Sequence, residues 1–407
     1  CRYGAACGLS SLALCALQTK SDLRRDLRLH ARSVAGPDRK SGRTIYWSRV
    51  KILHVETGMS MYGGAQQVAY LLESMARHGI ENILVCPPGA AIGQHFSNVS
   101  GVRVCEVPCS GDLDLMFISR LRKVLRQHQP DLVHLHSRRG ADLLGGIAAK
   151  RERIACVLSR RVDNPENRWW AALKYRLFDR VICISQGISA VLSDCGVARE
   201  KLRAVRSSVD PVPWQHAESR EAFCTEFGVP TDAVLIGVVA QLIERKGHRV
   251  LFEALRMIPQ RDALKVICFG KGPIRESLEQ DAADLSDTVS FAGFRDDLPR
   301  WVGALDILVH PAMMEGLGVS LLQASAAGVP IIASRAGGMP EAVADGVSGM
   351  LVAPGDAAEL AQALSKLCTD AALRKTLGAQ GQKRTEEEFS VEKMVQGNIA
   401  VYRELLA

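Results

Sequence analysis

One segment of the chain combines a carboxylate, a glycine-rich turn and a helix start. The apolar run Ile307–Val309 precedes it, and Gly316 and Gly318 predict a tight turn before a helix that starts near Val319 and runs to about Ala327. The free N–H groups and the dipole at such a helix start bind anions, so a diphosphate would fit there. Glu315 lies just outside the helix, and its acceptor-only carboxylate could bind the hydroxyls of a sugar.

A second candidate is the cation pair Arg245 and Lys246, which follows the apolar run Val234–Ala240. Two cations beside the end of a strand suit a diphosphate, because Arg offers forked donors and Lys a point charge. Taken alone, two adjacent charges are more often a solvated surface pair. The other motifs of the chain reverse this judgement and favour a ligand-binding role for the pair.

Two loops in the first half of the chain could also contribute to a site. Gly63 and Gly64 would let the backbone approach a phosphate, although a simple turn explains them about as well. Strand alternation places His134 and His136 on one face of the run Leu132–Leu135 and its continuation. His134 is more simply interpreted as a core histidine, whereas the position of His136 at the strand end favours a role in a site.

The elements that must position these residues alternate between short apolar strands and amphipathic helices, which predicts βαβ units with parallel sheets. The pattern breaks near residue 210, between Ser207 and Pro213, and then restarts. The predicted fold class is therefore α/β, with two Rossmann-like domains facing across a cleft. The predicted divisions are a disordered extension, or a segment upstream of the true start, at 1–49, an N-terminal domain at 50–210, a C-terminal domain at 211–390, and a helix at 391–407 that could cross back to the N-terminal domain.

The net charge of +7 gives no support to nucleic-acid binding once its location is considered. Residues 1–49 contain ten lysines and arginines against three aspartates, so residues 50–407 hold 41 basic and 41 acidic side chains. A formally neutral globular part lacks the basic surface that nucleic acids require.

Twelve cysteines occur without C-x-x-C pairs or zinc spacing, and several lie inside apolar runs. Buried, reduced thiols are the simplest interpretation and favour a reducing, cytoplasmic compartment. We expect no metal and no resident cofactor, since no strand ends in an Asp-x-Asp motif.

Taken together, these segments resemble the family 4 retaining glycosyltransferases over essentially all of residues 50–407. The resemblance is carried by Gly63-Gly64, His134-Leu135-His136, Arg245-Lys246-Gly247, the Glu315 segment, Gly337-Gly338-Met339-Pro340-Glu341, Asp345-Gly346 and Pro354-Gly355-Asp356. It implies a GT-B fold, in which the C-terminal domain holds a nucleotide-sugar donor and the N-terminal domain the acceptor.

The resemblance also implies roles for individual residues. Glu315 would contact the donor sugar, and His136 would line the reaction centre. The residues expected to bind the donor are Gly63, Gly64, Arg245, Lys246, Gly316, Leu317, Gly318, Val319 and Gln323.

The chain departs from the family pattern at two positions. The family has a second glutamate eight residues after the first, which commonly binds the ribose, and here that position is Gln323. Gln can still accept a hydrogen bond but lacks the charge that strengthens it. Many members also have an arginine where this chain has Gln241, and Arg245 could supply the missing charge.

The expected function is metal-independent transfer of a sugar, with retention of configuration, from a nucleotide sugar to a glycan or lipid-linked acceptor in cell-surface polysaccharide or lipopolysaccharide biosynthesis. A nucleotide-sugar epimerase and a non-catalytic sugar-nucleotide-binding protein remain alternatives. The basic, amphipathic stretch 118–128 could rest on anionic lipid at the inner face of the cytoplasmic membrane, or could be an ordinary solvated helix face.

Overall fold

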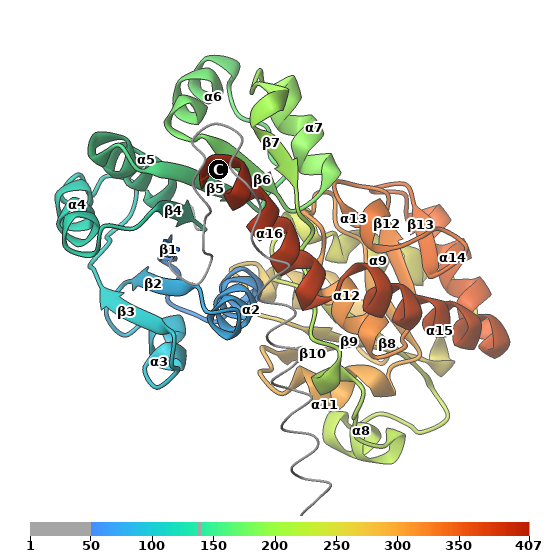
Figure 1. Ribbon diagram of the computed structural model, residues 1–407. Helices are drawn as coiled ribbons and strands as arrows, with labels where there is room; N and C mark the ends of the chain where they lie inside the picture. The colour runs from blue at the N-terminus through green and yellow to red at the C-terminus, as the bar shows by residue number, and fades with distance from the viewer. Residues whose placement is uncertain (1–49, 137–139, 407) are drawn as a thin grey trace, which may run out of the picture.

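The computed structural model describes residues 50–136 and 140–406, and the segment 1–49 lies outside the described residues. Within the described residues the chain forms two parallel β-sheets, each covered by helices (Figure 1). The predicted α/β fold class, with two Rossmann-like domains, is confirmed.

The first sheet has seven strands in the order β3-β2-β1-β4-β5-β6-β7. Their bounds are β1 Lys51–Val55, β2 Glu81–Cys86, β3 Val102–Glu106, β4 Leu132–Leu135, β5 Ala155–Arg160, β6 Arg180–Cys183 and β7 Leu202–Ala204. The helices of this domain are α2 Gly63–Arg77, α3 Ala91–Phe96, α4 Met116–His128, α5 Ala141–Glu152, α6 Arg168–Lys174 and α7 Gln186–Asp194. Strand β7 has only three residues and was not predicted from the sequence.

The second sheet has six strands in the order β10-β9-β8-β11-β12-β13. Their bounds are β8 Val234–Val239, β9 Leu264–Phe269, β10 Val289–Gly293, β11 Ile307–His310, β12 Ile331–Ser334 and β13 Gly349–Val352. The helices are α8 Arg220–Phe227, α9 His248–Arg256, α10 Arg275–Asp281, α11 Leu298–Trp301, α12 Val319–Ala326, α13 Met339–Ala342, α14 Ala357–Thr369, α15 Ala371–Glu388 and α16 Val391–Leu406.

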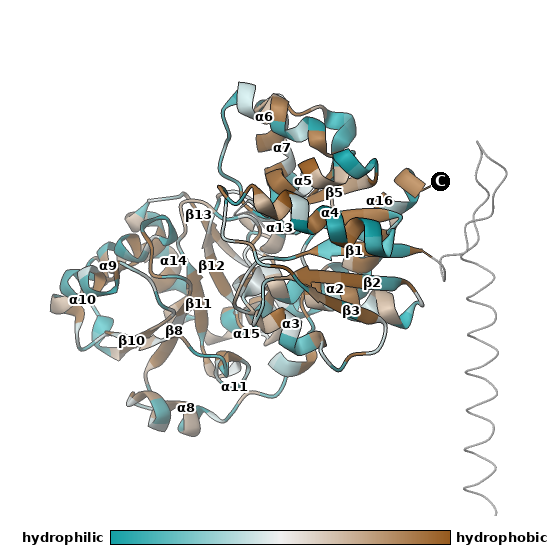
Figure 2. Ribbon diagram, turned by 90° about the vertical axis from the view of Figure 1, so that its left-hand side faces the viewer, coloured by the Kyte–Doolittle hydropathy of each residue, from teal (hydrophilic) through white to brown (hydrophobic). Residues whose placement is uncertain are grey.

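The central strands are apolar on both faces because helices cover both sides of each sheet. Every residue of β4 and β11 is buried, and the strands of both sheets are coloured largely hydrophobic in Figure 2. The helices show hydrophilic residues toward solvent in the same view.

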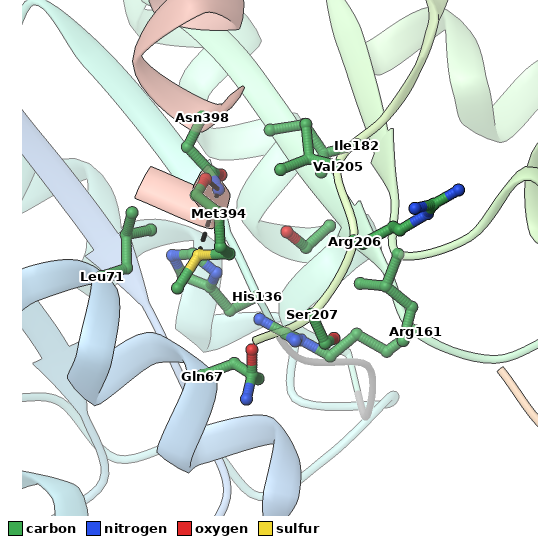
Figure 3. Close-up of a pocket in the computed structure, with 12 residues that line it drawn as sticks. Gln67, Leu71, His136, Arg161, Ile182, Val205, Arg206, Ser207, Met394 and Asn398 are labelled. Carbon is green, nitrogen blue, oxygen red and sulfur yellow. Dashed lines mark hydrogen bonds between the residues drawn. The ribbon is translucent and has the colours of Figure 1, made fainter. Parts of the chain in front are cut away.

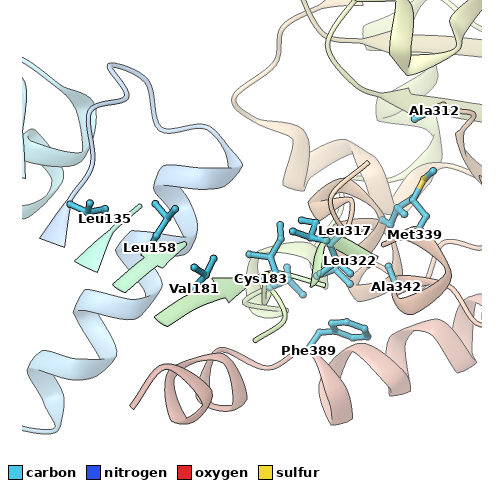
Figure 4. Packing of buried hydrophobic residues seen from close by; sticks show 14 of the residues in the cluster. Leu135, Leu158, Val181, Cys183, Ala312, Leu317, Leu322, Met339, Ala342 and Phe389 are labelled. Atoms are coloured by element: carbon cyan, nitrogen blue, oxygen red, sulfur yellow. The ribbon is translucent and has the colours of Figure 1, made fainter. Parts of the chain in front are cut away.

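The two domains share one continuous apolar cluster of buried side chains. In Figure 4, Leu135, Leu158 and Cys183 follow one another across the first sheet, and Leu317 and Met339 of the second domain continue the row. Burial of apolar surface at the boundary therefore holds the domains in contact.

Helix α16 leaves the second domain and packs on the first. It contacts α2, and its buried residues Val395, Ile399 and Tyr402 join a cluster with Ile52 of β1 (Figure 1). The chain thus passes twice between the domains.

Tyr402 ties α16 to the first sheet by a buried hydrogen bond. Its hydroxyl lies 2.6 Å from Nδ1 of His134, and both side chains are fully buried. We expect Tyr402→Phe to lower the stability by about 1–3 kcal/mol, because a buried imidazole nitrogen then loses its partner.

The urea midpoint near neutral pH measures this effect. Gln396→Ala, on the exposed side of the same helix, is the control and should change stability by less than about 0.5 kcal/mol. Equal midpoints for Tyr402→Phe and the control would contradict the structural role of the hydrogen bond.

Candidate functional site

A cleft of about 270 Å³ lies where the two domains meet. The N-terminal domain contributes Gly64 and Arg161, and the C-terminal domain contributes Lys246, Glu315 and Gly318. These residues lie at or just beyond the carboxyl ends of strands or at helix starts, as expected for ligand sites in parallel sheets.

Glu315 is held by two neighbours in this cleft. Its Oε2 accepts hydrogen bonds from Lys246 Nζ and from His310 Nε2, the latter at 3.0 Å. Burial alone would raise the pKa of Glu315, but the hydrogen bonds from His310 and Lys246 and the charge of Lys246 outweigh it and hold the pKa far below its usual value. The carboxylate therefore stays ionised, and its charge neutralises Lys246.

Two helix starts face each other beside this carboxylate. Helix α12 begins after Gly318, whose φ of 89° and lack of a side chain leave the first N–H groups uncapped. Helix α2 begins at Gly63, also without a side-chain cap, and a Cβ at Gly63 would lie 3.6 Å from Val319. Neither helix carries an acidic residue in its first turn, so both dipoles leave positive potential in the cleft.

Glycines fix the backbone of Glu315 against the N-terminal domain. A Cβ at Gly316 would lie 2.4 Å from the carbonyl oxygen of Arg161, and a Cβ at Gly337 would lie 2.0 Å from the carbonyl oxygen of Glu315. The N–H of Gly338 donates to that same carbonyl at 3.0 Å. Only glycine permits these approaches, so the glycines place Glu315 at the domain boundary.

The structure places His134 in the core. Register pairs it with His54 of β1, and its ring nitrogens bond Tyr402 and Ser159 at 2.6 and 2.8 Å. His136 follows β4 and lines a hollow of about 490 Å³ on the N-terminal side of the cleft. The two histidines therefore differ in surroundings, as their positions along the strand indicated.

Hydrogen bonds determine the tautomer of His136. Asn82 donates through Nδ2 to the carbonyl of Ile80, so its Oδ1 accepts from His54 Nε2 at 3.2 Å. Nδ1 of His54 is then an acceptor, and Nε2 of His136 donates to it at 2.9 Å. The remaining nitrogen of His136, Nδ1, therefore carries a lone pair and has no partner among the described residues.

The ring nitrogens of His54, His134 and His136 lie close enough together to suggest a metal site. However, both nitrogens of His54 and both of His134 have hydrogen-bond partners in the protein. These bonds account for the close approach of the three rings without an ion.

Some predicted site residues do not face the cleft. The Arg245 side chain is exposed and is not among the residues that line it, and Gln323 lies half-buried further along α12. The backbone of Arg245 has a structural role, because its carbonyl accepts from the N–H of Met313 at 2.8 Å. The roles of both side chains in donor binding stay predictions.

Three residues of the site were not anticipated from the sequence. His310 supports Glu315, His54 orients His136, and Arg161 lines the cleft from the end of β5. Each lies in or directly after a strand, and this position is the sequence feature that could have marked these three as site residues.

The two halves of the chain match two family models. Residues 61–212 match glycosyltransferase family 4, and residues 233–370 match the glycosyl transferases of group 1. The chain belongs to the family 4 glycosyltransferases with the GT-B fold.

Relatives and solved structures agree with this family over most of the chain. The chain is 27% identical to the lipopolysaccharide core biosynthesis glycosyltransferase LpsE of Rhizobium meliloti, over 88% of this chain and 99% of the relative. It is 26% identical to a 2-deoxystreptamine glucosyltransferase of Streptomyces kanamyceticus, again over 88% and 99%. The structure of Anabaena HepE with UDP and glucose superposes with a TM-score of 0.77 at 20% identity, over 88% of this chain and all of that one.

The buried histidines of the two domains predict an acid-sensitive fold. Burial lowers the pKa of His54 to about 3 and that of His248 to about 4, and it also lowers the pKa of His134, His136 and His310. The unfolded chain binds protons at these histidines below about pH 6.5, whereas the folded protein binds them only at lower pH. Stability is therefore fully present above that pH and falls as the pH drops, by up to about 1.4 kcal/mol per pH unit for each histidine.

Urea unfolding at about pH 7.5 and about pH 5.5 measures this dependence, in a range where carboxylates contribute little. We expect a lower midpoint at the acidic pH, and the same decrease in the control His216→Gln, because His216 is exposed. A midpoint that does not change with pH would show that these histidines are not buried in the neutral form.

Proposed function

We propose that this glycosyltransferase transfers a sugar from a nucleotide-sugar donor to a glycan or lipid-linked acceptor, with retention of configuration and without a metal ion. The observation that carries the proposal is the ionised Glu315, held beside Lys246 at the uncapped start of α12 in a cleft between two domains. A carboxylate there is placed to bind sugar hydroxyls, and the helix start beside it is placed to bind a diphosphate.

In the proposed reaction the bond between the anomeric carbon and the diphosphate oxygen breaks, and the acceptor hydroxyl bonds to that carbon on the same face. The departing phosphate oxygen takes the proton of the acceptor hydroxyl. The N–H groups of Gly318, Val319 and Ser320, together with Lys246, would stabilise the negative charge that develops on the leaving group. Fixed donors aimed at developing charge are usually the largest catalytic contribution.

His136 would contact the substrate from the N-terminal side of the cleft. Its Nδ1 is an unprotonated acceptor, and the low pKa that burial gives the ring keeps it neutral. A neutral imidazole at this position can accept a hydrogen bond from a hydroxyl of either substrate.

The relatives support a place in cell-surface glycan synthesis. Similar proteins from Rhizobium meliloti include LpsE, LpsD and LpsB, which are named for lipopolysaccharide core biosynthesis. HepE has been solved with UDP-glucose. We therefore propose a UDP-sugar as the donor to test first, with an acceptor from the lipopolysaccharide or another surface glycan.

Contact with the cytoplasmic membrane surface stays a hypothesis. In the structure it depends less on the basic charge of α4 and more on exposed apolar residues near its start. On α4, Arg122 and Arg126 both pair with Glu152, and Arg120 pairs with Asp114, so much of the basic charge is neutralised. The exposed apolar residues Leu113, Leu115 and Met116 lie at the start of the same helix. Among the described residues, no helix has the length and apolar character needed to span a bilayer.

Replacing Glu315 tests the proposed function directly. Glu315→Gln keeps the shape but removes the charge, and we expect turnover to fall by about 100-fold or more because the sugar loses a charged acceptor. The assay measures nucleotide release from UDP-, GDP- and ADP-sugars with and without acceptor glycans. The control is Glu253→Gln on the exposed face of α9.

Release that requires an acceptor would distinguish transfer from epimerisation and from simple binding. Full turnover in Glu315→Gln would contradict the role given to this carboxylate.

The glycine at 337 offers a test through geometry alone. Both Gly337 and Gly346 have positive φ, at 55° and 70°, but only at Gly337 would a Cβ collide with the carbonyl of Glu315. We expect Gly337→Ala to displace Glu315 and reduce turnover on the order of 100-fold. Gly346→Ala should cost only the strain of its φ, about 1–2 kcal/mol of stability, with turnover unchanged. Equal turnover in the two variants would show that the contact does not position the carboxylate.

A further inference from the structure

Three residues that line one small hollow in the N-terminal domain each have a buried polar atom with no hydrogen-bond partner in the described part of the chain. These atoms are Arg161 Nε, His136 Nδ1 and Ser207 Oγ, and all three residues line a space of about 10 Å³. Figure 3 shows the Arg161 side chain reaching toward Ser207, Gln67 and His136. Buried polar atoms are rarely left unpaired, and several around one space indicate a polar ligand atom or water there.

Among the described residues, the Arg161 side chain lacks the hydrogen-bond and ion-pair partners that the neighbouring Arg160 has. Its neighbour Arg160 pairs with Glu166 at 3.0 Å and donates to the carbonyl of Asn164 at 2.8 Å. Within residues 50–136 and 140–406, the Arg161 side chain has no ion pair and no hydrogen bond. Burial of this guanidinium lowers its pKa, and the charge of Glu56 offsets the effect only in part. The folded protein therefore holds an incompletely compensated charge, which is unfavourable unless a ligand compensates it.

The position of Arg161 connects the two sides of the reaction site. It lines the interdomain cleft with Lys246 and Glu315. It also lines, with His136, the larger hollow of about 490 Å³ on the N-terminal side of that cleft. Its Cδ would lie 3.7 Å from a Cβ at Gly64, so the side chain runs along the start of α2. Its carbonyl lies against Gly316, directly before the start of α12.

Among the described residues that line the cleft, Arg161 is a cation without an ion pair, and the charge of Glu56 compensates it only in part. Lys246 is paired with Glu315, and His310 is kept neutral by burial, which lowers its pKa. The starts of α2 and α12 add positive potential on either side of the guanidinium. This charge distribution favours an anionic ligand such as a diphosphate.

We propose that Arg161 binds the diphosphate of the donor from the N-terminal domain, opposite Lys246 and the start of α12. This assignment rests on the proposed function and adds to it a substrate-contacting cation supplied by the other domain. Binding of the diphosphate would satisfy the guanidinium and would draw the two domains onto the same ligand. Arg161 would then also stabilise the charge of the departing nucleoside diphosphate.

Calorimetric binding of UDP and of uridine tests the assignment, because the two probes differ only in the diphosphate. We expect Arg161→Gln to weaken UDP binding by about 10- to 100-fold, as for loss of a charge-assisted hydrogen bond, and to leave uridine binding unchanged. The UDP affinity of Arg161→Lys should lie between those of the wild type and of Arg161→Gln, since lysine keeps the charge but lacks the forked N–H donors of arginine. Arg203→Gln is the matched control, because Arg203 pairs with Glu404 on α16 and does not line the cleft.

The melting temperature without ligand separates binding from a structural role. Removal of an unpaired, partly desolvated charge should leave the melting temperature of Arg161→Gln equal to or above that of the wild type. A lowered melting temperature with parallel loss of uridine binding would overturn the proposal, and so would unchanged UDP affinity. If the wild-type protein binds none of UDP, GDP and ADP, the proposed function itself fails and this assignment fails with it.

Discussion

The arrangement of this enzyme depends on a close backbone contact between its two domains. Gly316 lies against the carbonyl of Arg161, and Gly338 would place a Cβ 2.1 Å from the carbonyl of Gly316 and 2.7 Å from Cβ of Ser185. At this boundary the main chains approach more closely than any side chain would allow. Glu315 therefore stands at a fixed distance from the N-terminal domain, and the starts of α2 and α12 are brought face to face. The apolar cluster that spans the boundary supplies stability, but the glycines determine the geometry.

At this boundary the cation of the C-terminal domain has an ion pair, whereas Arg161 of the N-terminal domain forms none among the described residues. Lys246 and His310 both donate to Glu315, while Nδ1 of His310 has no partner among the described residues. Arg161 and His136 likewise keep a donor and an acceptor without partners in the described protein. An unsatisfied buried group favours a ligand that satisfies it, so Arg161 and His136 would add contacts to those proposed for Glu315 and Lys246.

Much of the fold could be predicted from the sequence because apolar strands and amphipathic helices alternate with a clear period. The short strands β7 and β13 were not anticipated, since three or four residues at the edge of a sheet carry little periodic signal. In the site, the Glu315 segment could be identified because the carboxylate, the glycine turn and the helix start follow one another directly in the sequence. Arg161 was not, because Arg160 and Arg161 are identical in type and only their surroundings make one an ion-paired residue and the other a cleft residue. His54 was missed for a similar reason, as its partner lies 82 residues away.

The return of α16 to the first domain has a consequence for the order in which the newly made chain can fold. The C-terminal sheet is built from one uninterrupted stretch, β8 to β13, and can assemble once that stretch has left the ribosome. The N-terminal sheet is made before the C-terminal sheet but is completed after it, because Ile52 and His134 acquire their α16 neighbours only after residues 391–406 exist. Until then the face of its sheet that α16 will cover is exposed, which is the state in which nascent chains are most prone to aggregate. Domains usually fold in the order of their synthesis. Here a helix that follows the entire C-terminal sheet in the sequence completes the N-terminal domain.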